Sequence, residues 1–264
     1  MIYPIQSIGR FEIIRPHTTL KKWYDAQADK PDVLFNGSLY SSSGVPCGTL
    51  WEAGALTVNQ GNGWGFGTRD GKTVEFASPF VGAWREYLTA YPAIVRGGHA
   101  LTELPWKDSY VFNKSLHRIA FGRLKSGQFA VFCENSKTIM GFSKDGADAG
   151  FDALCNLDGG GSRALMVDGK WIYTSTRTPY NAVAIWYADP AEQKGEKEMR
   201  VKCARKTQTY DRLGKAEKNR HIDPGDVCEI NTTLTANLLC EITYPVKGGM
   251  RKAYIRDLGN FMAG

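Results

Sequence analysis

The sequence predicts an α+β protein, with a mixed β-sheet domain carrying a few helices followed by a small β-barrel. Aromatic residues make up 12% of the 264 residues and include seven Trp, a composition typical of a folded protein rich in strands. Short apolar runs bounded by Gly, Pro, Asn and Asp recur along the chain and predict many short strands. Only residues 19–28 and 143–153 predict helices longer than a turn.

The length allows one sizeable core and a second small one. Residues 188–198 are polar, charged and aperiodic, which is typical of a linker. We therefore expect a first domain over residues 1–190, a linker over 191–198 and a second domain over 199–264.

The N-terminal part predicts a strand, a helix and a second strand. Residues 11–15 form the first strand, and Thr18 or Thr19 caps the helix that follows. After Pro31, an apolar strand over residues 32–35 runs into Asn36-Gly37. Asn36 has two interpretations, as a turn former or as a hydrogen-bonding partner of a substrate.

The middle of the chain predicts loops, hairpins and one helix. The expected elements are loops and hairpins over 41–71, a hairpin turn at 69–72, one helical turn at 82–87, a strand and turn at 91–98, a surface loop at 101–115, two strands over 117–133 and the helix over 143–153. Two polar residues begin the first strand of 117–133. Arg118 either pairs with a carboxylate or binds phosphate through its planar guanidinium. His117 is either a general acid or base or a structural polar neighbour.

The stretch after the apolar strand 154–157 concentrates the most chemistry. That strand leads to Asp158, three consecutive glycines (Gly159, Gly160, Gly161), Ser162 and Arg163. Three glycines lose much backbone entropy on ordering, and their N–H groups can converge on an anion. A carboxylate, a hydroxyl and a guanidinium beside them predict an anion or sugar site. The alternative is a glycine-rich strand connection without a ligand, since the pattern is neither a Walker loop nor a dinucleotide fingerprint.

Further strands follow this stretch. Residues 164–167 form a strand, Asp168-Gly169 a tight turn, and residues 170–174 the returning strand. A polar loop then carries Arg177 and Asn181 into a buried strand over 182–187. Beyond the linker the pattern is short strands and turns, which predict the small barrel.

Charge and cysteine content restrict the partners. The net charge is +6, and residues 199–264 hold 12 Lys/Arg against 7 Asp/Glu. This basic segment suits an anionic surface such as a polymer, a membrane or nucleic acid, or it is a solvated face without a partner; we expect a cell-wall polymer rather than nucleic acid. The six cysteines form no CxxC pair and no metal-like spacing with the four histidines, so we expect reduced thiols, no metal and no cofactor.

The N-terminus has no basic start followed by an apolar core, so we expect no signal peptide. No apolar run approaches the ~18 residues of a membrane helix. We expect synthesis in the cytoplasm, and any action at the cell wall to follow lysis or occur as part of a virion.

Several motifs follow one another in order along the chain: Asn36-Gly37, Tyr91-Pro92-Ala93, His117-Arg118-Ile-Ala-Phe-Gly122, Leu157-Asp-Gly-Gly-Gly-Ser162, Arg177 and Asn181-Ala182. This order resembles the phosphodiester glycosidase family, which includes the mannose-6-phosphate uncovering N-acetylglucosaminidase. The resemblance spans roughly residues 5–188. Residues 38–40 and Arg163 depart from the family pattern, which leaves substrate preference open. The C-terminal segment is similar to bacterial SH3-like domains appended to cell-wall enzymes, and the combination resembles a phage or prophage protein.

This resemblance implies a hydrolase that cleaves the bond between a sugar C1 and a phosphodiester oxygen. Asp158 would act on C1 as nucleophile or as base for water, and Arg118 and Arg177 would hold the phosphate. The second carboxylate is left open, with Glu52 and Asp168 as candidates. The implied substrate-binding residues are Asn36, Gly37, His117, Gly159, Gly160, Gly161, Ser162, Arg163 and Asn181.

The implied substrate is a phosphodiester-linked glycan, such as a cell-wall teichoic acid, or a sugar phosphate. Two other classes of function remain open. One is a non-catalytic protein that binds a sugar phosphate or a nucleotide-like ligand. The other is a wall-anchoring or peptide-binding module in which the basic segment 199–264 is the functional part.

Overall fold

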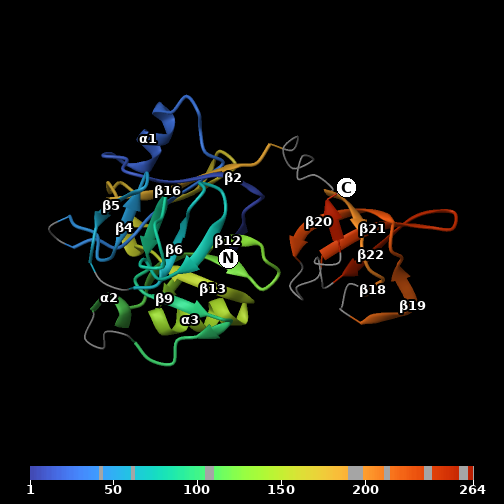
Figure 1. Ribbon diagram of the computed structural model, residues 1–264. Helices are drawn as coiled ribbons and strands as arrows, with labels where there is room; N and C mark the ends of the chain where they lie inside the picture. The colour runs from blue at the N-terminus through green and yellow to red at the C-terminus, as the bar shows by residue number, and fades with distance from the viewer. Residues whose placement is uncertain are drawn as a thin grey trace. The chain divides into compact units, whose positions relative to one another are not determined.

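The computed structural model describes residues 1–41, 44–60, 63–104, 110–189, 199–210, 215–234, 240–255 and 261–263. The chain divides into two compact units, Met1–Ala188 and Asp189–Gly264 (Figure 1). The predicted linker over 191–198 and part of the predicted loop over 101–115 lie outside the described residues.

The first unit is built from three antiparallel sheets. The first sheet has the order β1 (Ile2–Pro4), β12 (Phe129–Lys137), β11 (Leu116–Leu124), β13 (Phe151–Asn156), β9 (Ala93–Arg96) and β10 (His99–Ala100). The second has the order β15 (Lys170–Tyr173), β14 (Leu165–Val167), β3 (Val33–Asn36), β16 (Ala182–Tyr187) and β2 (Ile8–Ile14). The third has the order β5 (Ala55–Val58), β4 (Leu50–Glu52), β8 (Glu86–Thr89), β6 (Gly65–Thr68) and β7 (Val74–Ala77).

One aromatic residue joins the three sheets of this unit. Phe121 on β11 is fully buried, and its ring centroid lies 5.6 Å from that of Phe35 on β3 and 4.8 Å from that of Phe66 on β6. All three rings belong to one hydrophobic core. The sheets therefore share a common interior, to which apolar side chains from distant parts of the sequence contribute.

The helices are short. As predicted, Thr19 caps α1 (Leu20–Ala26), and its side chain accepts a hydrogen bond from the Lys22 N–H. The others are α2 (Tyr110–Asn113) and α3 (Ile139–Asp148). In Figure 1, α3 lies against β9 and β13 of the first sheet. None of the helices described is long and apolar enough to cross a membrane.

The second predicted helix begins earlier than expected. Thr138 caps α3 by accepting a hydrogen bond from the Gly141 N–H at 3.2 Å. Ser143, where the predicted helix begins, is instead buried in the helix and donates its hydroxyl proton to the Ile94 carbonyl. The predicted start of this helix at residue 143 was wrong. The sequence alone does not distinguish a hydroxyl that caps a helix from one that hydrogen bonds to a neighbouring strand.

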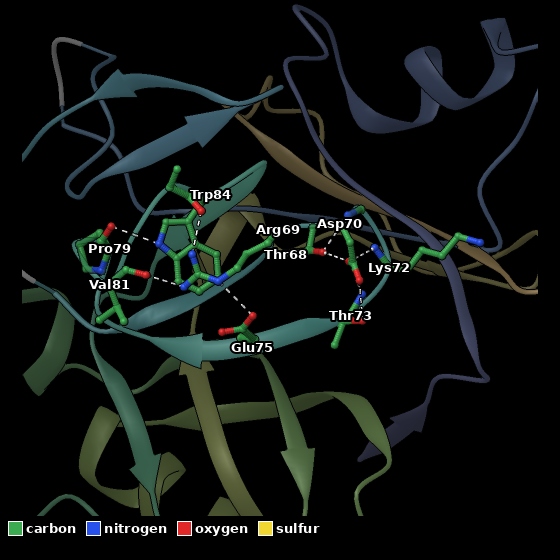
Figure 2. Close-up of polar contacts among 11 residues, drawn as sticks. Thr68, Arg69, Asp70, Lys72, Thr73, Glu75, Pro79, Val81 and Trp84 are labelled. Carbon is green, nitrogen blue, oxygen red and sulfur yellow. Dashed lines mark hydrogen bonds and ion pairs between the residues drawn. The ribbon is translucent and has the colours of Figure 1, made fainter. Parts of the chain in front are cut away.

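The predicted helical turn at 82–87 is also wrong. Glu86–Thr89 forms β8, and the preceding loop is held by Arg69, whose guanidinium lies 4.1 Å from the Trp84 ring centroid (Figure 2). Arg69 donates to the Val81 and Ala83 carbonyls and pairs with Glu75, while the buried Trp84 donates its indole N–H to Pro79 (Figure 2). These contacts satisfy the loop backbone without a helix.

The second unit is one antiparallel sheet with its own small core. Its order is β19 (Ala216–Ile222), β18 (Thr207–Tyr210), β22 (Gly249–Ile255), β21 (Cys240–Val246), β20 (Val227–Leu234), β17 (Met199–Cys203) and β23 (Phe261–Ala263). Over the ranges described, β19 and β23 stand at opposite ends of this order and do not pair, so no closed barrel forms.

The predicted fold class therefore needs correction. In the part of the chain that the structure describes, the protein is mostly β with antiparallel sheets, so the α+β class with a mixed sheet was wrong, and no closed SH3-like barrel is found there. Strands joined by hairpins pair antiparallel, whereas parallel neighbours need long crossover connections. The turn signals in the sequence were therefore evidence for antiparallel pairing.

Candidate functional site

The Asp158–Arg163 segment leaves the end of β13 and forms a single 3-10 turn over Gly160–Ser162. A Cβ on Gly159 would stand 2.4 Å from the His117 carbonyl oxygen, so no larger residue fits there. Gly160 has a φ of +57°, a conformation that favours glycine. These two positions explain why the turn needs glycine at its start.

Three predicted site residues meet at this turn. The Ser162 side chain hydrogen bonds to the Asp158 carboxyl, and Arg177 Nη1 donates to Ser162 Oγ at 3.3 Å. Burial raises the pKa of Asp158, while the bonds from Ser162 and the Gly159 N–H and the charge of Arg177 act in the opposite direction. Asp158, Ser162 and Arg177 thus form a continuous carboxyl–hydroxyl–guanidinium chain, which we call the Asp158 cluster.

The loop before β16 positions the guanidinium of this cluster. The Ser175 hydroxyl donates to the Gly161 carbonyl at 2.7 Å and accepts the Arg177 N–H at 3.0 Å. A Cβ on Gly161 would lie 3.1 Å from the guanidinium carbon, so the third glycine leaves room for Arg177. The Arg177 side chain is exposed, and it is therefore accessible to a ligand.

Asn36 fastens the same segment at both ends. Its side-chain N–H donates to the Asp158 carbonyl at 2.5 Å, and its side-chain oxygen accepts the Ala164 N–H at 2.8 Å. Asn36 is only 1% exposed. Its observed contacts hold the glycine turn, and they leave the amide inside the protein.

Asn181 fixes the strand end that carries Asn36. Its amide accepts the Ser38 N–H at 2.9 Å and donates to the Ser38 hydroxyl at 2.8 Å. A Cβ on Gly37 would stand 1.7 Å from the Asn181 side-chain oxygen, which explains the glycine. Gly37 in turn accepts the Asp158 N–H at 3.0 Å. Asn181 and Gly37 therefore position the Asp158 backbone.

The remaining predicted residues lie beside the turn, with two of them directed into protein. Arg118 is 1% exposed and donates to the carbonyls of Lys114 and Lys137, and burial lowers its pKa to about 10. The Arg163 guanidinium lies 3.7 Å from the Tyr173 ring centroid and donates to the Glu134 carbonyl and the Asn135 side chain. The third residue, His117, is exposed on β11.

The two candidates for a second carboxylate have other positions. Glu52 forms a two-point ion pair with Arg15 and accepts the Thr57 hydroxyl at 2.7 Å. Asp168 occupies the turn between β14 and β15, at the opposite end of β14 from Ser162. Neither is part of the Asp158 cluster.

One neighbour of this cluster was not predicted from the sequence. Cys47 lies close enough to Asp158 for the carboxylate charge to raise the pKa of its thiol, although burial is the larger cause. Cys47 falls in a loop-rich stretch without periodicity, so no local pattern indicated its position. Among the described residues, no three His, Cys, Asp or Glu side chains are arranged to hold a metal ion.

Comparison with solved structures identifies the class of fold to which the chain is similar. No family model matches the chain, and no curated protein matches it. A solved structure of the zebrafish N-acetylglucosamine-1-phosphodiester alpha-N-acetylglucosaminidase catalytic domain, auto-inhibited by its pro-peptide, matches with a TM-score of 0.55. The identity is 16%, over 68% of this chain and 73% of that one. The chain therefore contains a phosphodiester glycosidase-like fold, as the resemblance predicted.

A second solved structure has a similar fold. It is a hypothetical protein from Synechocystis, with a TM-score of 0.54 and 11% identity over 71% of this chain. The match spans 57% of that protein, a little over half of its length.

Proposed function

We propose that the protein is a hydrolase that cleaves a sugar-1-phosphodiester between the anomeric carbon and the bridging oxygen. The observation that carries this proposal is the Asp158 cluster at the end of β13, where a carboxyl, a hydroxyl and an exposed guanidinium converge. The fold is similar to that of the zebrafish N-acetylglucosamine-1-phosphodiester alpha-N-acetylglucosaminidase catalytic domain.

The cluster suits this reaction because the phosphate is already a good leaving group. The protein must mainly hold the phosphate and stabilise positive charge at the sugar C1. Arg177 would bind the phosphate oxygens through its planar guanidinium. Asp158 would act at C1, either as nucleophile or as base for water. The C1–O bond breaks with its electron pair on the phosphate oxygen, and water supplies the hydroxyl of the released sugar.

The other predicted site residues support the cluster indirectly in this proposal. Asn36 and Asn181 position the Asp158 backbone, since their amides bond to protein groups. Arg118 shapes the neighbouring strand end, because its buried guanidinium donates to two carbonyls. Gly161 leaves room for the guanidinium, because a Cβ there would lie 3.1 Å from the Arg177 guanidinium carbon.

The test is hydrolysis of α-N-acetylglucosamine 1-phosphomethyl diester, with free sugar and new phosphomonoester measured together. Equal amounts of free N-acetylglucosamine and methyl phosphate support the proposal. Release of N-acetylglucosamine 1-phosphate would mean that a P–O bond is cut, which contradicts it. Tight binding without turnover would identify a sugar-phosphate or nucleotide-like binding protein.

We further propose a cell-wall polymer such as teichoic acid as the natural substrate, and a phage or prophage protein as the context. The excess of basic residues over 199–264 supports the anionic polymer. Lys206 and Lys218 are exposed in the second unit. Reversing both charges to Glu should weaken retention of the full chain on purified wall at low salt; unchanged retention would argue against this polymer.

A further inference from the structure

The β4–β5 hairpin buries little apolar surface against the rest of the first unit. β5 is the edge strand of the third sheet, next to β4. Every residue over 53–57 is exposed, and the apolar Leu56 is 41% exposed. Leu50, at the start of the hairpin, is buried in the core. Segments that bury few apolar contacts open at a low free-energy cost, so the closed hairpin depends on polar contacts at its tip, Ala53-Gly54.

The buried Glu86 carboxyl joins this tip to another sheet. Its Oε1 accepts the Ala53 N–H at 3.2 Å, and its Oε2 accepts the Ile13 N–H of β2 at 3.3 Å. Glu86 itself lies on β8 and is 4% exposed. The Gly54 N–H adds a bond of 2.8 Å to the Arg85 carbonyl. One side chain therefore connects the tip of a third-sheet hairpin with β2 of the second sheet.

Ala53 adopts a backbone conformation that favours opening of the tip. Its φ is +48°, in the left-handed region that is unfavourable for a residue with a Cβ. Such a conformation persists only where surrounding contacts compensate for it. The hydrogen bond to Glu86 is one of these contacts, and the bond from Gly54 is another. The tip is therefore a strained turn whose closure depends in part on the Glu86 carboxyl.

Few positive charges are available to compensate an ionised Glu86. The charged residues on the elements packed against it are Arg10, Glu12 and Arg15 on or directly after β2, Glu52 on β4, and Arg85 directly before β8. Both arginines of the β2 segment already pair with other carboxylates, and β6 has no charged residue. The pKa of Glu86 is raised to about 7, chiefly by burial and also by the charge of Glu12, while its two N–H bonds and the charge of Arg85 act in the opposite direction.

We propose that Glu86 acts as a pH-sensitive latch, which holds the β4–β5 hairpin closed while the carboxyl is protonated and releases its tip when the carboxyl ionises. A protonated carboxyl carries no charge and still accepts hydrogen bonds, so it can stay between the tip and β2. When its proton leaves to water, the carboxylate gains hydration only if the tip moves away. That movement also relieves the strain at Ala53. The latch is a property of the fold and does not depend on the proposed reaction.

Amide hydrogen exchange of the full chain, measured by mass spectrometry at pH 6 and pH 8, tests the latch. Each rate is divided by the intrinsic exchange rate at that pH to give an opening constant. For residues 50–58 this constant should rise about tenfold from pH 6 to pH 8, as expected for a group that titrates near 7 in the closed state and near its ordinary 4.5 in the open state. In Glu86→Gln, which cannot ionise, the constant should be equal at the two pH values. Glu103→Gln, at an exposed position, is the control and should behave as the wild type.

A low concentration of urea separates local opening of the hairpin from unfolding of the whole unit. Local opening exposes little surface, so it is nearly independent of urea, whereas global unfolding is favoured by urea. Exchange of residues 50–58 should therefore be unchanged in ~1 M urea, while exchange in the buried strand β11 accelerates. Hairpin exchange that follows urea as β11 does would overturn the proposal. The absence of a rise with pH in the wild type, or a rise that persists in Glu86→Gln, would overturn it as well.

The variant Ala53→Gly tests the strained turn, even if Glu86→Gln fails to fold. Glycine adopts a positive φ without a steric cost, so the opening constant of residues 50–58 should fall about fivefold at both pH values and keep its rise with pH. Ala55→Gly, in the same exposed hairpin but without a positive φ, is the matched control and should not lower the constant. An unchanged or higher opening constant in Ala53→Gly would contradict the latch.

Discussion

Asn36 donates its side-chain N–H to the carbonyl of Asp158 at 2.5 Å, across 122 residues of sequence. The side-chain oxygen of the same amide accepts the Ala164 N–H, so one buried residue holds both ends of the glycine turn. This relationship divides the residues of the candidate site into two groups. Asp158, Ser162 and Arg177 form the cluster that we propose binds a ligand, while Asn36 and Asn181 position the segment that carries Asp158.

We expect Asp158→Asn to abolish turnover of the sugar phosphodiester, with a loss of at least about a thousandfold in kcat. The fold should survive with an equal or higher melting temperature, because burial already disfavours the charged carboxylate. Asp168→Asn is the matched control and should retain activity, since Asp168 lies at the far end of β14. Near-wild-type turnover by folded Asp158→Asn would rule out this role.

Asn36→Ala should lower both stability and activity. The change leaves the buried Ala164 N–H and the Asp158 carbonyl without this partner, at a cost of about 1–3 kcal/mol per unsatisfied group. Urea unfolding measures the loss, and Asn59→Ala, at an exposed position, is the control. If kcat stays unchanged in the folded variant, Asn36 does not position the catalytic segment.

Arg177→Ala should lower kcat/KM about a hundredfold through loss of the phosphate contact. Arg177→Lys should recover only part of this loss, because an ammonium group cannot reproduce two parallel hydrogen bonds. Arg205→Ala, at an exposed position in the second unit, controls for loss of one positive charge. Equal kcat/KM values in the Ala and Lys variants and the wild type would exclude Arg177 from phosphate binding.

Glu86 should make the protein less stable as the pH rises. Burial raises the pKa of Glu86 to about 7, from an ordinary 4.5. Between these values the folded state binds more protons than the unfolded state, so the free energy of unfolding falls with pH. The fall is fully developed above pH 7 and is on the order of 3 kcal/mol at most.

Melting temperatures at pH 5 and pH 8 test this expectation. The drop between the two should shrink in Glu86→Gln, which cannot ionise, and persist in Glu103→Gln, at an exposed position. A drop of the same size in all three proteins would show that Glu86 does not titrate in this range.

Arg69→Ala should destabilise the first unit by about 2 kcal/mol, because it removes charge-assisted bonds to two loop carbonyls and the contact with Trp84 (Figure 2). Arg69→Lys keeps the charge but loses the forked geometry, so its unfolding midpoint should lie between those of Arg69→Ala and the wild type. Three equal midpoints would contradict this account.

The sequence was sufficient for local features and insufficient for long-range ones. The cap at Thr19 and the hairpin joining β11 and β12 follow from nearby residues. Arg118 and Arg163 were predicted to bind substrate because a guanidinium suits phosphate, yet burial directs both onto protein carbonyls. Their direction depends on neighbours such as Lys137 and Glu134, which no spacing along the chain reveals. The closed barrel failed for the same reason, since edge pairing is a property of the whole sheet.

The joining of three sheets at Phe121 has a consequence for synthesis. Phe11 on β2 packs against both Phe66 and Phe121, and β2 pairs along its length with β16, the last strand of the first unit. A nascent chain emerging from the ribosome therefore cannot complete this interior until about residue 187 has cleared the exit tunnel. Until then β2 lacks its pairing strand β16, so a chaperone has a long period in which it can bind the exposed β2.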